Sequence, residues 1–333
     1  MNILFTSAGR RVQLLKDFKA SLAQGSKLVT TDMSYLAPAI YVADRYYIVP
    51  AINDPEYINT ILDICGKESI DAVTTLIDPE IEILAKNRKK FANHHVEVLA
   101  PYEETARLCF NKYEMYKFLS NHDIPTPLTF GTAQEAIDAE NNGKVSYPLF
   151  VKPRTGSGSV GARKVYDESE LREAFEADPS LIAQQLMTGI DLDADVYVDT
   201  ISEKPVSIFS KRKLQMKIGG ASKTISFRDH KLVEFIQNVL SNFHFHGPID
   251  MDFFNVDGRY YLNEINPRFG GAYLHAYGCG VDFIKLIENN INGIENKPSF
   301  LNYEDDVAMM MYDAVVIQKI DKARLENWGG ANK

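Results

Sequence analysis

Apolar residues in the first hundred positions gather in short runs that alternate with segments of helical period. The runs that we predict as strands are Asn2–Thr6, Lys27–Thr31, Tyr46–Val49, Ala72–Leu76 and Val96–Ala100. Helices are predicted after Gly9, at Glu56–Cys65 and from Asp78, with Asp78 as N-cap and Pro79 at the first helical position. Strands that alternate with helices predict a Rossmann-like parallel sheet covered on both faces.

A different pattern begins near Tyr102. Two helices are predicted at Glu103–Phe110 and Lys112–Asn121, followed by a strand at Tyr147–Pro153 and a glycine-rich loop. After residue 181 strands predominate, and the last apolar run, Val307–Val316, lies in a tail. We therefore predict an α/β protein with a parallel-sheet domain at 1–101 and a two-lobed α+β domain whose lobes are 102–180 and 181–333.

Composition and charge narrow the class of protein. The chain has 333 residues, of which 45% are hydrophobic and 24% charged, as in ordinary globular proteins. No apolar run approaches the length of a membrane span, and the early arginines follow a very short apolar run, which is the wrong order for a secretory signal. A net charge of -9 disfavours a nucleic-acid partner. Three scattered cysteines indicate free thiols, so we expect a cytoplasmic protein.

The first candidate site is the segment SAGRR, where the first strand ends. It contains one glycine, so it lacks the three glycines with which a nicotinamide-binding turn approaches pyrophosphate. Two arginines at the start of a helix are unfavourable against the helix dipole, which indicates an anionic ligand near them. A solvated helix start is the alternative, and the two interpretations are equally supported. Ligands gather at the carboxyl ends of parallel strands. We therefore assign Ser7, Arg10 and Arg11 to part of a substrate site.

The second candidate site is the segment YPLFVKPRTGSGSVGARKV. Lys152 ends an apolar strand and is followed by a loop rich in glycine and serine. Such a loop offers several backbone N–H donors to phosphate oxygens. The lysine precedes the glycines and a strand follows them, so this is not a Walker A loop. Phosphate binding is favoured over the alternative of a flexible hairpin tip.

The third candidate site is LNEINPR together with Asp252 on the preceding strand. Alternate residues of a strand share a face, so Glu264, Asn266 and Arg268 are expected to point the same way. Carboxylate and amide oxygens suit Mg²⁺, and a guanidinium suits an anionic oxygen beside it. The alternative is an exposed face with a Glu264–Arg268 salt bridge. Asp252 can join the metal site only if the hairpin has a three-residue loop or a bulge, because a regular two-residue turn places it opposite Asn263.

Other polar segments carry weaker signals. His244 and His246 flank Phe245 without a third soft ligand, so they are more simply surface or partly buried histidines than a zinc site. The run Lys211–Lys213 is most simply solvated, although one of its residues could reach a phosphate. No nucleophile elbow or Cys/His pairing indicates a covalent nucleophile.

Taken in order, these motifs resemble the ATP-grasp enzymes, and most closely short proteins that are similar to one half of the carbamoyl phosphate synthase large subunit. The resemblance extends from Met1 to about residue 300. It is carried by NKYEMYKFLSNHDIPTP, YPLFVKPRTGSGSVGARKV and IDMDFFNVDGRYYLNEINPRFGG.

The resemblance implies a role for individual residues. Lys112 and Lys152 match phosphate lysines, Arg268 matches an arginine that stabilises the phosphorylated intermediate, and we assign Lys152 and Arg268 as catalytic. The implied magnesium ligands are Asp252, Glu264 and Asn266. The other implied ATP-binding residues are Arg154, Gly156, Ser157, Gly158, Ser159 and Gly161 in the loop, Gln184, Gln185, Leu186 and Met187 at the adenine hinge, and Asp191 at the ribose. Gln184 replaces a common hinge glutamate, and Asp191 is one carbon shorter than the usual ribose ligand.

The resemblance implies an ATP- and Mg²⁺-dependent ligase, for which Mn²⁺ can replace Mg²⁺. Such an enzyme phosphorylates a carboxylate and transfers the acyl group to an amine, so its partners are two small molecules, and a homodimer is compatible with it. Phosphorylation of bicarbonate or carbamate is the first alternative, and a catalytically inactive nucleotide sensor is the second. A nicotinamide oxidoreductase is disfavoured by the missing glycines.

Overall fold

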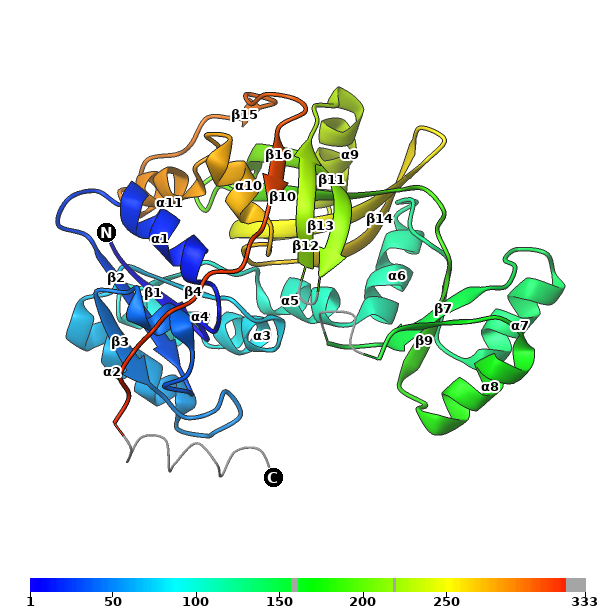
Figure 1. Ribbon diagram of the computed structural model, residues 1–333, viewed down its shortest axis with the longest axis horizontal. Coiled ribbons are helices and arrows are strands. Elements are labelled where there is room, and N and C mark those ends of the chain that lie inside the picture. Colours follow the sequence, from blue (N-terminus) through cyan, green and yellow to red (C-terminus); the bar gives the residue numbers. More distant parts are fainter. Residues whose placement is uncertain (157–160, 218–219, 322–333) are drawn as a thin grey trace.

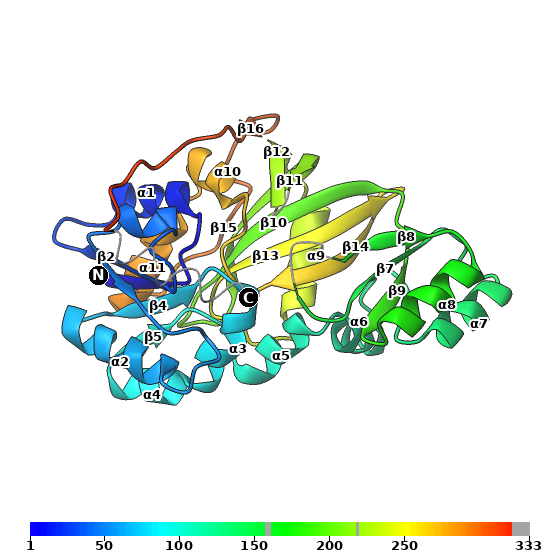
Figure 2. The ribbon, with the colours of Figure 1, turned by 60° about the horizontal axis from the view of Figure 1, so that its bottom comes forward.

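The computed structural model describes residues 1–156, 161–217 and 220–321. The chain forms three sheets arranged along one long axis, with the N-terminal domain at one end and the small lobe of 129–185 at the other (Figure 1). A seven-stranded sheet lies between them, as the turned view in Figure 2 also shows. No helix of the described residues is both long enough and apolar enough to cross a bilayer.

The N-terminal sheet is parallel, with strand order β3-β2-β1-β4-β5. Its strands are β1 (Asn2–Thr6), β2 (Lys27–Asp32), β3 (Arg45–Ile48), β4 (Ala72–Thr75) and β5 (Glu97–Val98). Its helices are α1 (Val12–Ser21), the short η1 (Pro38–Tyr41), α2 (Tyr57–Glu68), α3 (Asp78–Lys86) and α4 (Arg88–Asn93). The predicted parallel α/β sheet is confirmed. Its buried strands consist almost entirely of apolar residues and threonine, as a sheet covered on both faces requires.

Two helices follow, and both begin and end as the sequence predicts: α5 (Glu103–Phe110) and α6 (Lys112–Asn121). They are separated by Asn111, whose side chain accepts hydrogen bonds from Tyr113 N and Glu114 N and so caps α6. The small lobe is a four-stranded antiparallel sheet of order β6-β9-β7-β8. Its elements are β6 (Thr129–Phe130), α7 (Ala133–Asn141), β7 (Leu149–Pro153), β8 (Arg163–Val165), α8 (Glu168–Ala177) and β9 (Leu181–Gln185).

The large sheet has the order β14-β13-β10-β11-β12-β16, and β15 pairs with β11. Its strands are β10 (Ile190–Val198), β11 (Pro205–Lys217), β12 (Gly220–Ser226), β13 (Gly247–Val256), β14 (Arg259–Asn266), β15 (Ser299–Phe300) and β16 (Ala308–Met310). Helix α9 (His230–Leu240) buries Leu232, Ile236 and Val239 against the apolar residues of one face. Each such side chain contributes about 1.5–3 kcal/mol when it is removed from water.

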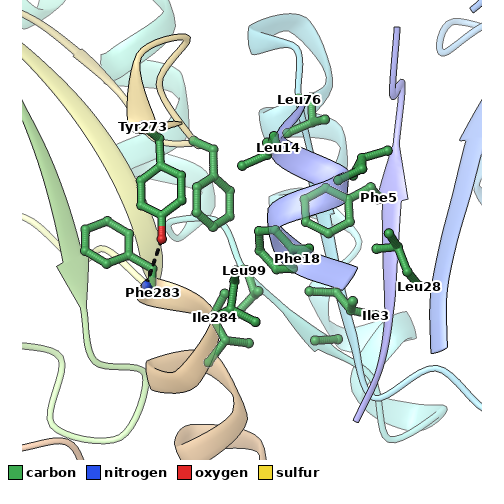
Figure 3. Packing of buried hydrophobic residues seen from close by; sticks show 14 of the residues in the cluster. Ile3, Phe5, Leu14, Phe18, Leu28, Leu76, Leu99, Tyr273, Phe283 and Ile284 are labelled. Carbon is green, nitrogen blue, oxygen red and sulfur yellow. Dashed lines mark hydrogen bonds between the residues drawn. The ribbon is translucent and has the colours of Figure 1, made fainter. Parts of the chain in front are cut away.

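The other face of the large sheet packs on the N-terminal domain. Helices α10 (Tyr273–Gly278) and α11 (Phe283–Ile291) lie between the two, and all three parts contribute to one hydrophobic cluster. In Figure 3, Phe5 and Phe18 of the N-terminal domain lie on the opposite side of this cluster from Tyr273 and Phe283. The ring of Phe269 lies 5.2 Å from that of Phe18, edge to face. The domain boundaries near residues 101 and 180 remain predictions. The hydrophobic cluster crosses the first of them, because it contains residues from both sides of residue 101.

Candidate active site

The hairpin of β13 and β14 brings the predicted metal ligands to one place. It turns through two residues, Asp257 and Gly258, both of which have positive φ (52° and 84°), as tight hairpin turns require. The register then shifts between Asp252 and Phe253, so that Asn263 is an extra residue on β14. Asp252 therefore lies directly opposite Glu264, and the expected bulge is present.

Charged residues continue this arrangement across the sheet. Asp252 pairs with Asp193 on β10, and Asp193 pairs with Lys211 on β11, so a row of four ionisable residues crosses four strands. The next row holds Asn266, Asp250 and Asp195. Carboxylate oxygens of Asp193, Asp195 and Asp250 all lie within 4.8 Å of one another, and all three residues are buried.

Burial and mutual repulsion shift the pKa values in this cluster. Burial raises the pKa of the Asp250 carboxyl well above its ordinary value, and the charges of Asp193 and Asp252 act in the same direction. Burial likewise raises the pKa of Asp195 to about 6. Lys211, which is fully buried, contacts both Asp193 and Asp195. The cluster is therefore a mixed network in which a buried ammonium compensates part of the negative charge.

The prediction that the Lys211–Lys213 run is solvated is wrong. Lys211 has no exposed surface, and the side chain of Lys213 is 8% exposed. The Nζ of Lys213 lies 2.8 Å from Asp191 Oδ1 and also contacts Asp252. Only Arg212, which stacks on Phe227, points away from the acidic rows, because alternate residues of β11 face opposite sides of the sheet.

Two lysines approach the same centre from elsewhere in the chain. Lys112, the first residue of α6, lies 3.2 Å from Glu264 Oε1 through its Nζ and donates a hydrogen bond to the carbonyl of Gly156. Lys152 on β7 has no hydrogen-bond or ion-pair partner within the part of the chain that the structure describes. Burial lowers the pKa of Lys152; the negative charge of Glu264 opposes this effect in part, and the positive charge of Lys112 adds to it. An unpaired ammonium in this position favours an anionic ligand.

The predicted phosphate loop is described in part. Arg154 donates to the carbonyl of Gly131 at 3.1 Å and stacks on Tyr113, and its own carbonyl accepts from Lys112 N at 2.9 Å. Gly156 and Gly161 have positive φ (99° and 74°), which only glycine adopts readily. Ser157, Gly158 and Ser159 lie outside the described residues.

The predicted adenine and ribose residues lie at the junction of the two lobes. Gln184 is buried and donates to Thr129 Oγ1 at 2.9 Å, whereas Gln185 accepts from Leu128 N. Leu186 and Met187 follow directly after β9 and are partly buried. Asp191 lies on β10 and is paired with Lys213, so it lies between the hinge and the metal ligands.

The three residues assigned to the substrate site have different surroundings in the structure. Ser7 donates to Glu80 Oε2 at 2.7 Å, and the side chain of Arg11 donates to the backbone carbonyls of Phe269 and Gly270. Burial lowers the pKa of Arg11 to about 10, and the charge of Arg268 acts in the same direction. Arg10 is exposed. Ser7 and Arg11 therefore join parts of the protein to each other, and their role in substrate binding stays a prediction.

Arg268 contacts the N-terminal domain. Its Nε lies 2.7 Å from Asp78 Oδ1 and its Nη2 lies 3.2 Å from Asp78 Oδ2. The expectation that Asp78 caps α3 is wrong, because Ile77 is the N-cap residue and the Asp78 carboxylate faces Arg268 instead. A small pocket adjoins Asp78 of this pair. Its lining includes Asp78, Cys109, Glu264 and Asn266.

The site residues that sequence reasoning missed had a visible signal. Asp193 and Asp195, which were missed, alternate along a strand with the predicted Asp191, as do Lys211 and Lys213 on the strand that pairs with it. Alternation places each set on one face. Asp250 shows the same spacing relative to Asp252. Asp78 gave no such signal, because its partner Arg268 is 190 residues away in the sequence.

Comparison with known proteins decides what kind of domain carries this site. Residues 109–272 match the family model described as "ATP-grasp domain", and residues 3–99 match the model described as "PylC-like, N-terminal domain". Residues 109–272 are an ATP-grasp domain. The glycine-rich loop, the hinge and the β13–β14 hairpin all lie within it.

Two relatives and one solved structure show how far the similarity extends. A formate-dependent phosphoribosylglycinamide formyltransferase from Sulfurisphaera tokodaii is 25% identical over 249 residues, which are 74% of this chain and 58% of the relative. A D-alanine–D-alanine ligase from Campylobacter concisus is 26% identical over 317 residues, covering 89% of this chain and 83% of the relative. The chain thus spans little more than half of the formyltransferase.

The solved structure is the biotin carboxylase domain of a 2-oxoglutarate carboxylase from Hydrogenobacter thermophilus, in complex with MgADP, ADP and bicarbonate. Its TM-score is 0.70 at 15% identity, over 92% of this chain and 73% of that one. At this identity the likeness shows the fold alone: an ATP-grasp domain preceded by a parallel-sheet domain. The finer resemblance to carbamoyl phosphate synthase is not part of these findings.

Proposed function

We propose that the protein is an ATP- and Mg²⁺-dependent ligase that activates a carboxylate as an acyl phosphate and joins it to an amine. The observation that carries the proposal is the Asn263 bulge, which brings Asp252 opposite Glu264, the carboxylate that Lys112 contacts. Fold, lysines and oxygen ligands together support nucleotide chemistry at this point. The relatives supply the reaction class, since one joins two amino acids and another is formate-dependent by name.

The residues present fit a divalent cation. Asp252, Glu264 and Asn266 offer only oxygen donors, and the two carboxylates already attract the ammonium groups of Lys213 and Lys112. When bound, Mg²⁺ would offset charge on the phosphates and favour transfer of the terminal phosphoryl group. Mn²⁺ fits the same donors.

The chain's own residues would act by position and charge. Lys112 and Lys152 would offset the negative charge of the nucleotide phosphates, and Gln184 to Met187 would border the adenine. A substrate carboxylate oxygen attacks the terminal phosphorus and the bond to ADP breaks. The amine nitrogen then attacks the acyl carbon, phosphate leaves, and the amine loses a proton. Arg268 would bind the anionic oxygens of the acyl phosphate, and no covalent nucleophile on the protein is needed.

Release of ADP and phosphate tests the proposal. The protein is incubated with MgATP and a panel of amino acids and small carboxylic acids, each with and without an amine. Turnover that needs both substrates supports the ligase. Turnover with bicarbonate and ammonia alone would instead support the carbamoyl phosphate synthase-like alternative. ADP binding without turnover under every condition would support the nucleotide sensor and overturn the proposal.

A substitution tests the metal ligands. Glu264→Ala should abolish Mg²⁺-dependent ADP release, because it removes a carboxylate opposite Asp252, while the protein stays folded. Glu82→Ala, on the surface of α3, is the control and should keep full turnover. Turnover of Glu264→Ala at the wild-type rate would contradict the metal assignment. A cytoplasmic location and a homodimer remain predictions.

A further inference from the structure

Arg268 is held in a fixed orientation by a residue of the N-terminal domain. The carboxylate of Asp78 accepts hydrogen bonds from both Nε and Nη2 of Arg268, so the planar guanidinium and the planar carboxylate lie edge to edge. The side chains of Arg268 and Asp78 are 14% and 12% exposed. Because little water reaches the pair, its hydrogen bonds fix the relative orientation of the two groups. Nη1 donates to the carbonyl of Phe269 at 3.1 Å. Nη1 also lies 3.5 Å from Asp250 Oδ2, so among the contacts of the described residues one N–H group of Nη2 remains for an anionic ligand.

A competing partner for Arg268 lies close by. Asp250 Oδ2 is 3.5 Å from Nη1, and Asp250 belongs to the buried acidic cluster. Without Asp78, the guanidinium would be drawn towards Asp250 and away from the metal ligands. Arg268 thus contacts both carboxylates, with two nitrogens on Asp78 and the longer contact on Asp250.

The N-terminal domain fixes Asp78 firmly. Asp78 is the first residue of α3, and two residues later Glu80 is fully buried and accepts hydrogen bonds from three hydroxyl groups. These come from Ser7 at 2.7 Å, Thr75 at 2.5 Å and Tyr57. The start of α3 is thus tied to the ends of β1 and β4. Burial, followed by the charge of Glu80, raises the pKa of Tyr57, so its hydroxyl remains a donor.

A reciprocal contact holds the other side of the arginine. Arg11 of the N-terminal domain reaches across to the carbonyls of Phe269 and Gly270, the two residues after Arg268. Each domain thus sends one arginine to the other, and the segment 268–270 is held from both sides. Contacts of this kind hold a charged group in one position, and catalysis requires such groups to be placed within a fraction of an ångström.

We propose that Asp78 is a positioning residue that aims Arg268 of the ATP-grasp domain at the reacting phosphoryl group. The inference rests on the proposed function only for the role of Arg268. It assigns the N-terminal domain a part in catalysis besides any binding of substrate, because the domain supplies the carboxylate that selects the productive orientation of the arginine.

The test compares Asp78→Asn and Arg268→Gln with the wild-type protein. ADP release is measured with the substrate pair that gives the fastest turnover, or as ATP hydrolysis without an added substrate, and MgADP affinity is measured by calorimetry. Asp78→Asn should lower kcat at least tenfold and leave the KM for ATP and the ADP affinity unchanged. Asp78→Glu should regain most of the loss. Lys86→Gln is the matched control, because it breaks the Lys86–Glu103 pair of the same helix without touching Arg268.

The double variant separates positioning from stability. If Asp78 acts through Arg268, adding Asp78→Asn to Arg268→Gln causes no further loss, whereas independent effects would multiply. Asp78→Ser is the second variant if Asp78→Asn fails to fold, because serine also lacks the carboxylate but is smaller than asparagine. Wild-type kcat in Asp78→Asn, with Arg268→Gln impaired, overturns the inference alone. Wild-type kcat in Arg268→Gln itself overturns the role of Arg268 in the proposed function.

Discussion

Replacing Lys152 with methionine should make the protein more stable and at the same time impair it. Methionine has a similar length but no charge, and the Lys152 ammonium has no ion-pair partner in the described part of the chain. Surrounding protein lowers its pKa, which means that the folded state disfavours the charged form. Removing an unpaired charge and burying an apolar chain in its place should gain about 1–2 kcal/mol.

The gain converts to a measurable shift. For a protein of 333 residues it corresponds to a rise in melting temperature of roughly 1.5–3 °C in the absence of nucleotide. The same substitution removes a charged hydrogen bond to phosphate, worth about 1.5–3 kcal/mol. ATP affinity should therefore fall roughly 10- to 150-fold.

Two assays check the reasoning. Differential scanning calorimetry without nucleotide gives the change in stability, and titration calorimetry with MgATP gives the change in affinity. Lys164→Met is the control, because Lys164 is exposed on the neighbouring strand β8 and should change neither quantity. A lower melting temperature for Lys152→Met without nucleotide, or an unaltered ATP affinity, would refute the argument that the unpaired charge is retained for a ligand.

Two further predictions concern stability. In Gly270→Ala the new Cβ would lie 2.6 Å from Asp250 Oδ1 and 2.9 Å from Asp195 Oδ1, so thermal unfolding should show a loss of about 1–3 kcal/mol; Gly278→Ala, with open space around it, is the control, and equal effects would contradict the steric argument. Burial raises the pKa of Asp199, but hydrogen bonds from Asn290, Ser202 and Asn296 outweigh it and hold the value at about 2. The folded-state pKa lies below the ordinary one, so this stability is complete above about pH 4 and is lost as the pH falls towards 2. Asp199→Asn should be less stable at pH 7 and lose less stability over that interval; parallel acid-unfolding curves would be evidence against it.

Local patterns in the sequence predicted most elements correctly, because strand and helix periods are read within a few residues. The helices α5 and α6 begin and end where the sequence indicates. Helix α7 and strand β12 were missed, since the apolar stripe of α7 is mostly alanine and β12 alternates small and polar residues. The alternation of strands and helices predicted that the first sheet is parallel, but it did not predict the order of the strands.

The hairpin shows where local patterns reach their limit. Leu262 and Ile265 are both buried, and their odd spacing is the trace of the bulge at Asn263. A regular strand would place Leu262 on the same face as Glu264. The sequence could state that a bulge or a longer loop was needed, but only the backbone register could choose between them.

Contacts between distant segments could not be predicted in the same way. Asp78 and Arg268 form an ion pair across 190 residues, and each had a satisfactory local explanation, as a helix cap and as an anion-binding group. The buried lysines of β11 had a similarly plausible local reading as solvent-exposed charges. Their true surroundings depend on which strands become neighbours, and that order is a property of the whole sheet.

The hydrophobic cluster that contains Phe5, Phe18, Phe269 and Phe283 joins the N-terminal domain to the large sheet and its helices, so these parts share one core. The small lobe has its own cluster, built from residues between 136 and 183 with partly buried neighbours. The domain boundary predicted from the sequence therefore does not mark a part of the structure that can be exchanged without disturbing the core. A chimaera that exchanges residues 1–101 with those of a relative would cut through this aromatic core, whereas one that exchanges 129–185 would leave it whole.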